Sequence, residues 1–122
     1  MWGGRGSLGR DSGLVGSEGR IMHASMDLIR QAINERRILA FRYHALPREV
    51  EPICLGETEH GKWQIRAYQV GGRSSSGRVG EGTPKLFELA AVVDVSVLPI
   101  TFEVPASYRR DDTAFIRIDK QL

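Results

Sequence analysis

The sequence predicts a mainly β domain with one N-terminal helix. Apolar residues recur at helical spacing in a single segment, whereas several later segments alternate polar with apolar residues, as half-buried strands do. The length of 122 residues fits one domain that folds without a metal or a disulfide. One helix followed by about five short antiparallel strands indicates a small, strongly bent sheet or barrel with the helix packed at one end.

The first twenty residues differ in composition from the rest of the chain. Residues 1–20 contain seven of the 14 glycines and show almost no apolar periodicity. Ordering so many glycines would cost backbone entropy without burying a core in return. We therefore expect a disordered, Gly-rich tail over 1–20 and a single domain over 21–122.

The helix is predicted from four apolar residues. Met22, Met26, Ile29 and Ile33 follow one another at spacings of four, three and four, which places them on one helical face. Ser25 is a suitable N-cap. These features predict an amphipathic helix over 25–37.

The strands are predicted from β-forming residues and from alternation. They are expected at 38–43, 48–55, 62–70, 85–89 and 93–103, and the end of the chain, 108–122, is expected to form a helical turn and a docking strand. Pro52 fits an edge strand or a bulge, because proline lacks a backbone N–H. In 62–70 the alternation places Trp63, Ile65, Ala67 and Gln69 on one face and Arg66, Tyr68 and Val70 on the other.

Composition excludes several classes of protein. No apolar stretch approaches the roughly 20 residues that span a bilayer, and no signal peptide is apparent. Cys54 is the only cysteine, which excludes a disulfide scaffold. We therefore expect a cytoplasmic protein without a membrane partner.

Positive charge gathers in the middle of the chain. Residues 60–85 contain five basic side chains against Glu81 alone, whereas the whole chain contains 17 basic and 15 acidic side chains. The basic residues flank a Gly- and Ser-rich loop, 71–83, beside a strand that carries Trp63 and Tyr68. Cations neutralise phosphates and aromatic rings stack on bases, so this region is a candidate nucleic-acid surface. A polar loop that is merely solvated is the alternative.

The order of several short motifs resembles the opening and the body of the WYL domain family. The resemblance covers about residues 25–122 and rests on Ile29–Arg37, Phe41–Tyr43, Arg48–Pro52, Trp63-Gln64-Ile65, Arg66–Gly72, Lys85–Leu89 and Tyr108–Asp111. The family is named after a Trp-Tyr-Leu tripeptide, which corresponds to residues 63–65 of this chain. Only Trp63 is retained, since Gln64 replaces Tyr and Ile65 replaces Leu.

The resemblance implies an Sm-like barrel of five strands after one helix. It further implies a ligand-sensing or nucleic-acid-binding module of bacterial and phage-defence regulators. By position, Tyr43, Arg48, Trp63 and Lys85 correspond to the family's binding residues, while Ala90 stands where a second arginine is often found. The family's usual DNA-binding helical domain has no room in this chain, which favours a free-standing or accessory regulator.

Catalytic and metal sites are not predicted. Cys54 lies between Ile53 and Leu55, an apolar context that favours an inert thiol. His23, His44 and His60 lack the paired spacing of zinc ligands. We expect neither an enzyme nor a cofactor, and a small metal-dependent nuclease is only a distant alternative.

The sequence thus predicts a regulatory module that binds single-stranded DNA, RNA or a nucleotide-like anionic ligand. The candidate binding residues are Tyr43, Arg48, Trp63, Arg66, Tyr68, Arg73, Arg78 and Lys85. Trp63 fits the core better than a ligand site, and Tyr68 is the better stacking candidate. The alternative is a protein-interaction or homo-oligomerisation module of a regulatory or phage-defence system.

Overall fold

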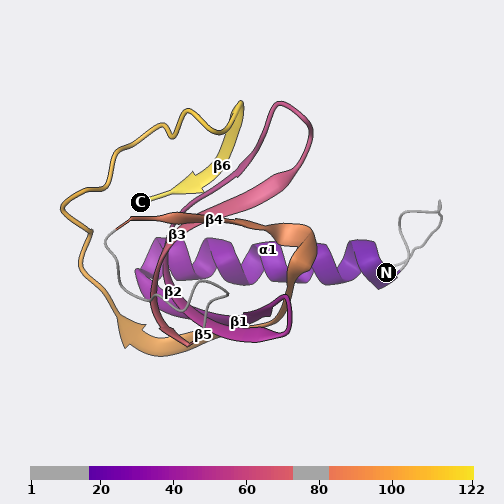
Figure 1. Cartoon of the computed structure of the whole chain (residues 1–122), viewed down its shortest axis with the longest axis horizontal. Coiled ribbons are helices and arrows are strands. Elements are labelled where there is room, and N and C mark those ends of the chain that lie inside the picture. Colours follow the sequence, from indigo (N-terminus) through magenta and orange to yellow (C-terminus); the bar gives the residue numbers. More distant parts are fainter. Residues whose placement is uncertain (1–16, 73–82) are drawn as a thin grey trace, which may run out of the picture.

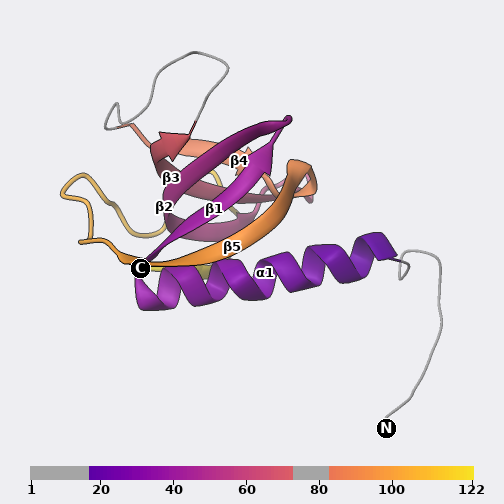
Figure 2. The same ribbon diagram turned by 90° about the horizontal axis from the view of Figure 1, so that it is seen from below.

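A single helix lies against a curved antiparallel sheet in the computed structural model, which describes residues 17–72 and 83–122 (Figures 1 and 2). The elements are α1 (Ser17–Glu35), β1 (Arg37–Tyr43), β2 (Leu46–Glu57), β3 (Trp63–Gly72), β4 (Lys85–Glu88), the short 3-10 helix η2 (Leu89–Ala91), β5 (Val92–Thr101) and β6 (Arg117–Gln121). The mainly β class with one helix is therefore confirmed.

The sheet has six strands: five lie between residues 37 and 101, and the sixth, β6, is the docking strand expected near the end of the chain. Its order is β4-β3-β2-β1-β5, and β6 also pairs with β2. Although β4 and β5 are consecutive in the chain, they lie at opposite ends of this order, separated in sequence by η2. Within the described ranges the sheet is therefore not closed, and the expected Sm-like barrel is not confirmed.

Helix α1 begins and ends earlier than predicted. It spans Ser17–Glu35 instead of 25–37 and includes the last four residues of the segment 1–20 that was expected to be disordered; residues 1–16 lie outside the described ranges. The predicted N-cap, Ser25, is buried within the helix. At the other end Arg36 adopts a positive φ of 52°, which ends the helix and starts the chain into β1.

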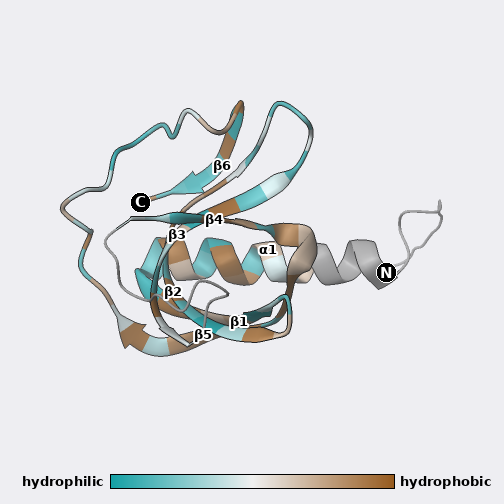
Figure 3. Ribbon diagram, in the orientation of Figure 1, coloured by the Kyte–Doolittle hydropathy of each residue, from teal (hydrophilic) through white to brown (hydrophobic). Residues whose placement is uncertain are grey.

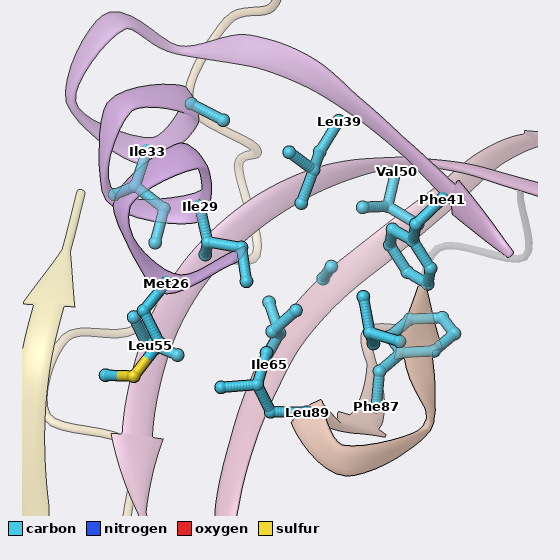
Figure 4. Packing of buried hydrophobic residues seen from close by; sticks show 13 residues of the cluster. Met26, Ile29, Ile33, Leu39, Phe41, Val50, Leu55, Ile65, Phe87 and Leu89 are labelled. Carbon is cyan, nitrogen blue, oxygen red and sulfur yellow. The ribbon is translucent and has the colours of Figure 1, made fainter. Parts of the chain in front are cut away.

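The main core lies between α1 and the sheet (Figure 4). Its buried residues are Met26, Ile29, Ala32, Ile33, Leu39, Phe41, Val50, Leu55, Ile65, Ala67, Phe87, Leu89 and Val92. Figure 3 shows hydrophobic and hydrophilic residues interspersed along the coloured part of α1 and along the strands. The core residues come from α1, β1 to β5 and η2. Ile65 and Ala67 face this core and Trp63 packs against it, as the alternation in β3 predicted.

A bulge in β2 creates a second, smaller core on the opposite face. The register shifts between the pairs Pro52↔Ala67 and Cys54↔Arg66, so Ile53 is the extra residue. Ile53 and Cys54 thereby enter one cluster with Tyr68 and Phe115. Pro52, which the sequence assigns to an edge strand or a bulge, directly precedes this bulge.

The segment between β5 and β6, residues 102–116, covers this second core and is called the strap below. It carries Phe115 into the cluster and leads into β6, which pairs with β2 from Glu57 to Cys54. Two strands share the edge of β2 that does not pair with β3. Strand β1 pairs with residues 46–50 of β2, and β6 pairs with residues 54–57. Pro52 lies in the interval between them.

Candidate anion-binding site

Arg48 is buried at one end of the core face. In β2 it alternates with Glu49, which is exposed, and shares its face with Val50 of the main core. Only 5% of Arg48 is exposed. Its guanidinium carbon lies 5.3 Å from the ring centre of Tyr43 and 5.7 Å from that of Phe87. Both contacts are cation–π interactions, which help to hold a cation away from water.

The hydrogen bonds of Arg48 are incomplete. Its Nη1 donates to Gln69 Oε1 at 3.2 Å, whereas its buried Nε has no acceptor. Burial lowers the pKa of Arg48, although a guanidinium stays charged in proteins. In the part of the chain that the structure describes, no carboxylate pairs with it. A buried donor without an acceptor costs free energy, so the Nε of Arg48 is suited to receive an acceptor from a ligand.

Lys85 approaches the same acceptor from β4. Its Nζ donates to Gln69 Oε1 at 3.3 Å. Gln69 is 3% exposed, and its Nε2 donates to Gly71 O at 3.1 Å, which turns its oxygen toward the two cations. We call Arg48, Lys85, Gln69, Tyr43 and Phe87 the anion site. In this site two cationic side chains share one neutral acceptor oxygen, and this arrangement is suited to binding an anion.

The aromatic wall of the anion site is fixed by its neighbours. The Tyr43 hydroxyl accepts a hydrogen bond from the Glu88 N–H at 3.0 Å. The ring of Tyr43 packs edge-on against that of Phe87, with 5.0 Å between the centroids. Phe87 is in turn fully buried in the main core. The positions of the Tyr43 and Phe87 rings are therefore fixed without a ligand.

The structure brings together only some of the predicted binding residues. Tyr43, Arg48 and Lys85 meet at the anion site. Trp63 lies six residues before Gln69 on β3, which is about 20 Å along an extended strand, so it belongs to the margin of the core instead. Arg73 and Arg78 lie outside the described residues.

Arg66 and Tyr68 lie on the other face of β3 and contact the strap. Arg66 Nε donates to Asp112 Oδ2 at 2.7 Å, and its Nη2 donates to Oδ1 at 3.3 Å. The hydroxyls of Tyr68 and Ser107 are hydrogen-bonded, and Tyr68 is only 7% exposed. Both side chains are therefore engaged in packing the strap, and they do not form one surface with the anion site.

A shallow pocket of about 300 Å³ lies where the strap meets β3. Each of its three arginines already donates to a protein acceptor: Arg66 to Asp112, Arg109 Nη1 to Tyr108 O at 3.3 Å, and Arg110 Nη1 to Leu122 O at 2.9 Å. The pocket therefore lacks the unsatisfied donor that distinguishes the anion site.

Gln69 and Phe87 are the members of the anion site that sequence reasoning missed as functional residues. The sequence does contain a signal for Gln69. An amide follows Trp63, Ile65 and Ala67 at the next position of the same face, where an apolar residue would continue the pattern. The sequence contains no such signal for Phe87, because an aromatic residue in a strand fits the core as well as it fits a binding site.

Cys54 is held as an unreactive thiol. Burial raises the pKa of the Cys54 thiol to about 12, so the nucleophilic thiolate is suppressed. Among residues 17–72 and 83–122, no group of three or more His, Cys, Asp or Glu side chains could hold a metal ion. The helix in these ranges is not apolar enough to cross a membrane.

Comparison with known proteins supports the fold. No family model and no curated protein matches the sequence. Among solved structures, the chain is similar to part of proteasome accessory factor B/C (PafBC) of Arthrobacter aurescens, with a TM-score of 0.54 and 23% sequence identity. The match covers 70% of this chain and 13% of that chain. At this identity the similarity shows the fold alone, a mainly β arrangement with one helix.

Proposed function

We propose that this chain is a non-enzymatic, WYL-like regulatory module that binds a nucleotide-like anionic ligand at the anion site. The observation that carries the proposal is Arg48, a buried cation whose Nε lacks an acceptor and whose one acceptor is shared with Lys85. An anionic group with two oxygens would supply the missing acceptor and neutralise both charges. The resemblance of the sequence motifs to the WYL family supports the regulatory role, and the structural similarity to part of PafBC, an accessory factor by its name, is compatible with it.

The geometry favours a small ligand over a long polynucleotide. A polynucleotide surface needs cations and stacking rings spread along one face. Here Arg66 is neutralised by Asp112 and Tyr68 is buried beneath the strap. Among the candidate cations that the structure describes, Arg48 and Lys85 remain, and they converge on one oxygen atom, which matches a single phosphate group. We place the module in the bacterial cytoplasm, where it would act on a regulator or a defence protein.

Calorimetric titration of the full chain tests the proposal. The ligands are adenosine monophosphate, inorganic phosphate and uncharged adenosine, together with twelve-nucleotide DNA and RNA oligomers at two salt concentrations. We expect adenosine monophosphate to bind more weakly at high salt, adenosine not to bind, and Arg48→Met or Lys85→Met to weaken binding at least about tenfold. Lys62→Met is the matched control, because Lys62 is exposed and makes only a 3.9 Å contact with Glu88.

Each other outcome has a definite meaning. A folded wild type that binds none of these anions at low salt would overturn the proposal. Binding that Arg48→Met and Lys85→Met leave unchanged would move the ligand away from the anion site. Tight binding of oligomers but not of the mononucleotide would replace the small ligand with a single-stranded nucleic acid.

A protein-interaction role is the second candidate, and β5 favours it. Within the described ranges β5 pairs only with β1, and it exposes 46% of Val93 and 54% of Ile100. A strand with a free edge and exposed apolar side chains is a common site of pairing with another chain. Light scattering tests this role: a stable assembly that Ile100→Lys dissociates, in a protein that ignores anions, would favour it.

A further inference from the structure

Gln69 lies where a bound anion would be expected. Its Oε1 accepts from Arg48 Nη1 at 3.2 Å and from Lys85 Nζ at 3.3 Å. Hydrogen bonds from cations to carboxylate or phosphate oxygens are typically about 2.7–2.9 Å. The amide oxygen therefore satisfies the two cations only weakly.

The rest of the side chain fixes this arrangement. Gln69 Nε2 donates to Gly71 O at 3.1 Å, so the amide cannot turn its NH₂ group toward the cations without losing that bond. The residue is 3% exposed, and burial of an amide is costly unless its polar atoms are paired. Gln69 thus occupies the site in one orientation, with its oxygen directed at both positive charges.

We propose that Gln69 is an internal substitute for the ligand, which an incoming anion displaces, and that it thereby sets the affinity and specificity of the anion site. This inference rests on the proposed function. A ligand must offer Arg48 and Lys85 more than the amide oxygen does. A phosphate group achieves this because it carries negative charge, and its oxygens can accept from both Arg48 Nη1 and Lys85 Nζ, the two donors that Gln69 Oε1 now serves. A ligand with one neutral oxygen gains nothing by the exchange.

The acceptor that residue 69 offers to the two cations then controls binding in both directions. Gln69→Leu removes the competitor and leaves both cations without this acceptor, so phosphate and adenosine monophosphate should bind about fivefold more tightly, the equivalent of one net hydrogen bond. Gln69→Glu places a carboxylate between the cations, so the same ligands should bind at least about tenfold more weakly. Gln64→Leu and Gln64→Glu are the matched controls, since Gln64 lies on the opposite face of β3 and pairs with Glu88.

The decisive experiment is calorimetric titration of the full-length variants with inorganic phosphate and adenosine monophosphate, with thermal unfolding as a check on folding. Tighter binding by Gln69→Leu together with weaker binding by Gln69→Glu supports the inference. If Gln69→Leu does not fold, Gln69→Met replaces it with the same expectation. If Arg48→Met abolishes binding while Gln69→Leu binds like the wild type or more weakly, the anion site stands and Gln69 is only a structural residue. If the wild type and all variants bind neither anion, the proposed function itself fails.

Discussion

Arg66 on β3 and Asp112 in the strap are 46 residues apart in the chain and form a two-point ion pair, with Nε 2.7 Å from Oδ2 and Nη2 3.3 Å from Oδ1. The side chains are 23% and 15% exposed. The pair, together with the Tyr68–Ser107 hydrogen bond, attaches an otherwise irregular segment to the back of the sheet.

The pair predicts that stability depends on pH through Asp112. The hydrogen bond from Arg66 lowers the pKa of Asp112 below its usual value of 3.8, and the Ala114 N–H acts in the same direction. A lowered folded-state pKa stabilises the protein above the unfolded-state value, and this stabilisation is lost as the pH falls through the folded-state pKa. Asp112→Asn should therefore differ most from the wild type in its free energy of unfolding near neutral pH, and the difference should narrow below about pH 4. Urea unfolding across this range measures it, and a difference that does not change with pH would contradict the assignment.

Truncation of Arg66 tests the same contact at constant pH. Arg66→Ala leaves the Asp112 carboxylate with only the Ala114 N–H, so the free energy of unfolding should fall by about 1–3 kcal/mol at pH 7. Lys62→Ala is the control, because its exposed pair with Glu88 should contribute less than about 1 kcal/mol. Equal losses in the two variants would show that the strap does not depend on Arg66.

Arg48→Met separates stability from binding. A buried cation without a charged partner costs free energy of solvation, and a methionine of similar length removes that cost. The free energy of unfolding of Arg48→Met should lie within about 1 kcal/mol of the wild type or above it, while anion binding is lost. Leu39→Ala, at a fully buried core position, should by contrast cost about 2–5 kcal/mol. A loss of that size in Arg48→Met, measured by urea unfolding, would make Arg48 a structural residue.

Alternation predicted the two faces of β3 correctly, because side chains of a strand point to opposite sides in turn. It could not predict what each face meets. Asp112, which neutralises Arg66, lies in a segment without periodicity, and its approach depends on the path of the strap. Similarly, the grouping of Arg48 with Lys85 depends on the register of β2, β3 and β4, which includes a shift between Glu49 and Val50 that no local pattern fixes.

The start of the helix was missed for a local reason. Gly19 lowers helix propensity, and the glycines before it favoured a disordered segment up to residue 20. The structure nevertheless extends α1 back to Ser17. The helix ends where Arg36 adopts a left-handed backbone conformation. Because Gly or Asn usually occupies this conformation, an arginine at this position does not indicate a helix end in the sequence.

Cys54 should report opening of the strap. The thiol is 2% exposed within the cluster that Tyr68 and Phe115 complete, and burial raises its pKa to about 12. Labelling by a thiol reagent at pH 8 should therefore be slow in the native protein, and Arg66→Ala should accelerate it by loosening the strap. The measurement is the labelling rate below the unfolding transition. A wild-type rate close to that of a free thiol, or an Arg66→Ala rate equal to that of the wild type, would contradict the coverage of Cys54 by the strap.

Gly56 should tolerate a side chain poorly, for steric reasons. A Cβ there would lie 2.6 Å from Phe115 Cγ and 2.7 Å from the Arg117 carbonyl oxygen, which is backbone of β6 and cannot rotate away. Gly56→Ala should lower the free energy of unfolding by about 1–3 kcal/mol and accelerate Cys54 labelling, because the strap must shift. Gly61→Ala is the control: its φ of +76° strains alanine, but its Cβ would meet nothing closer than 3.9 Å, so it should lower stability by only about 1 kcal/mol without changing the labelling rate. Urea unfolding and the rate of Cys54 labelling, measured for both variants, check these expectations. If only Gly61→Ala is labelled faster, the thiol reagent reaches Cys54 elsewhere than at the junction of Gly56 and Phe115.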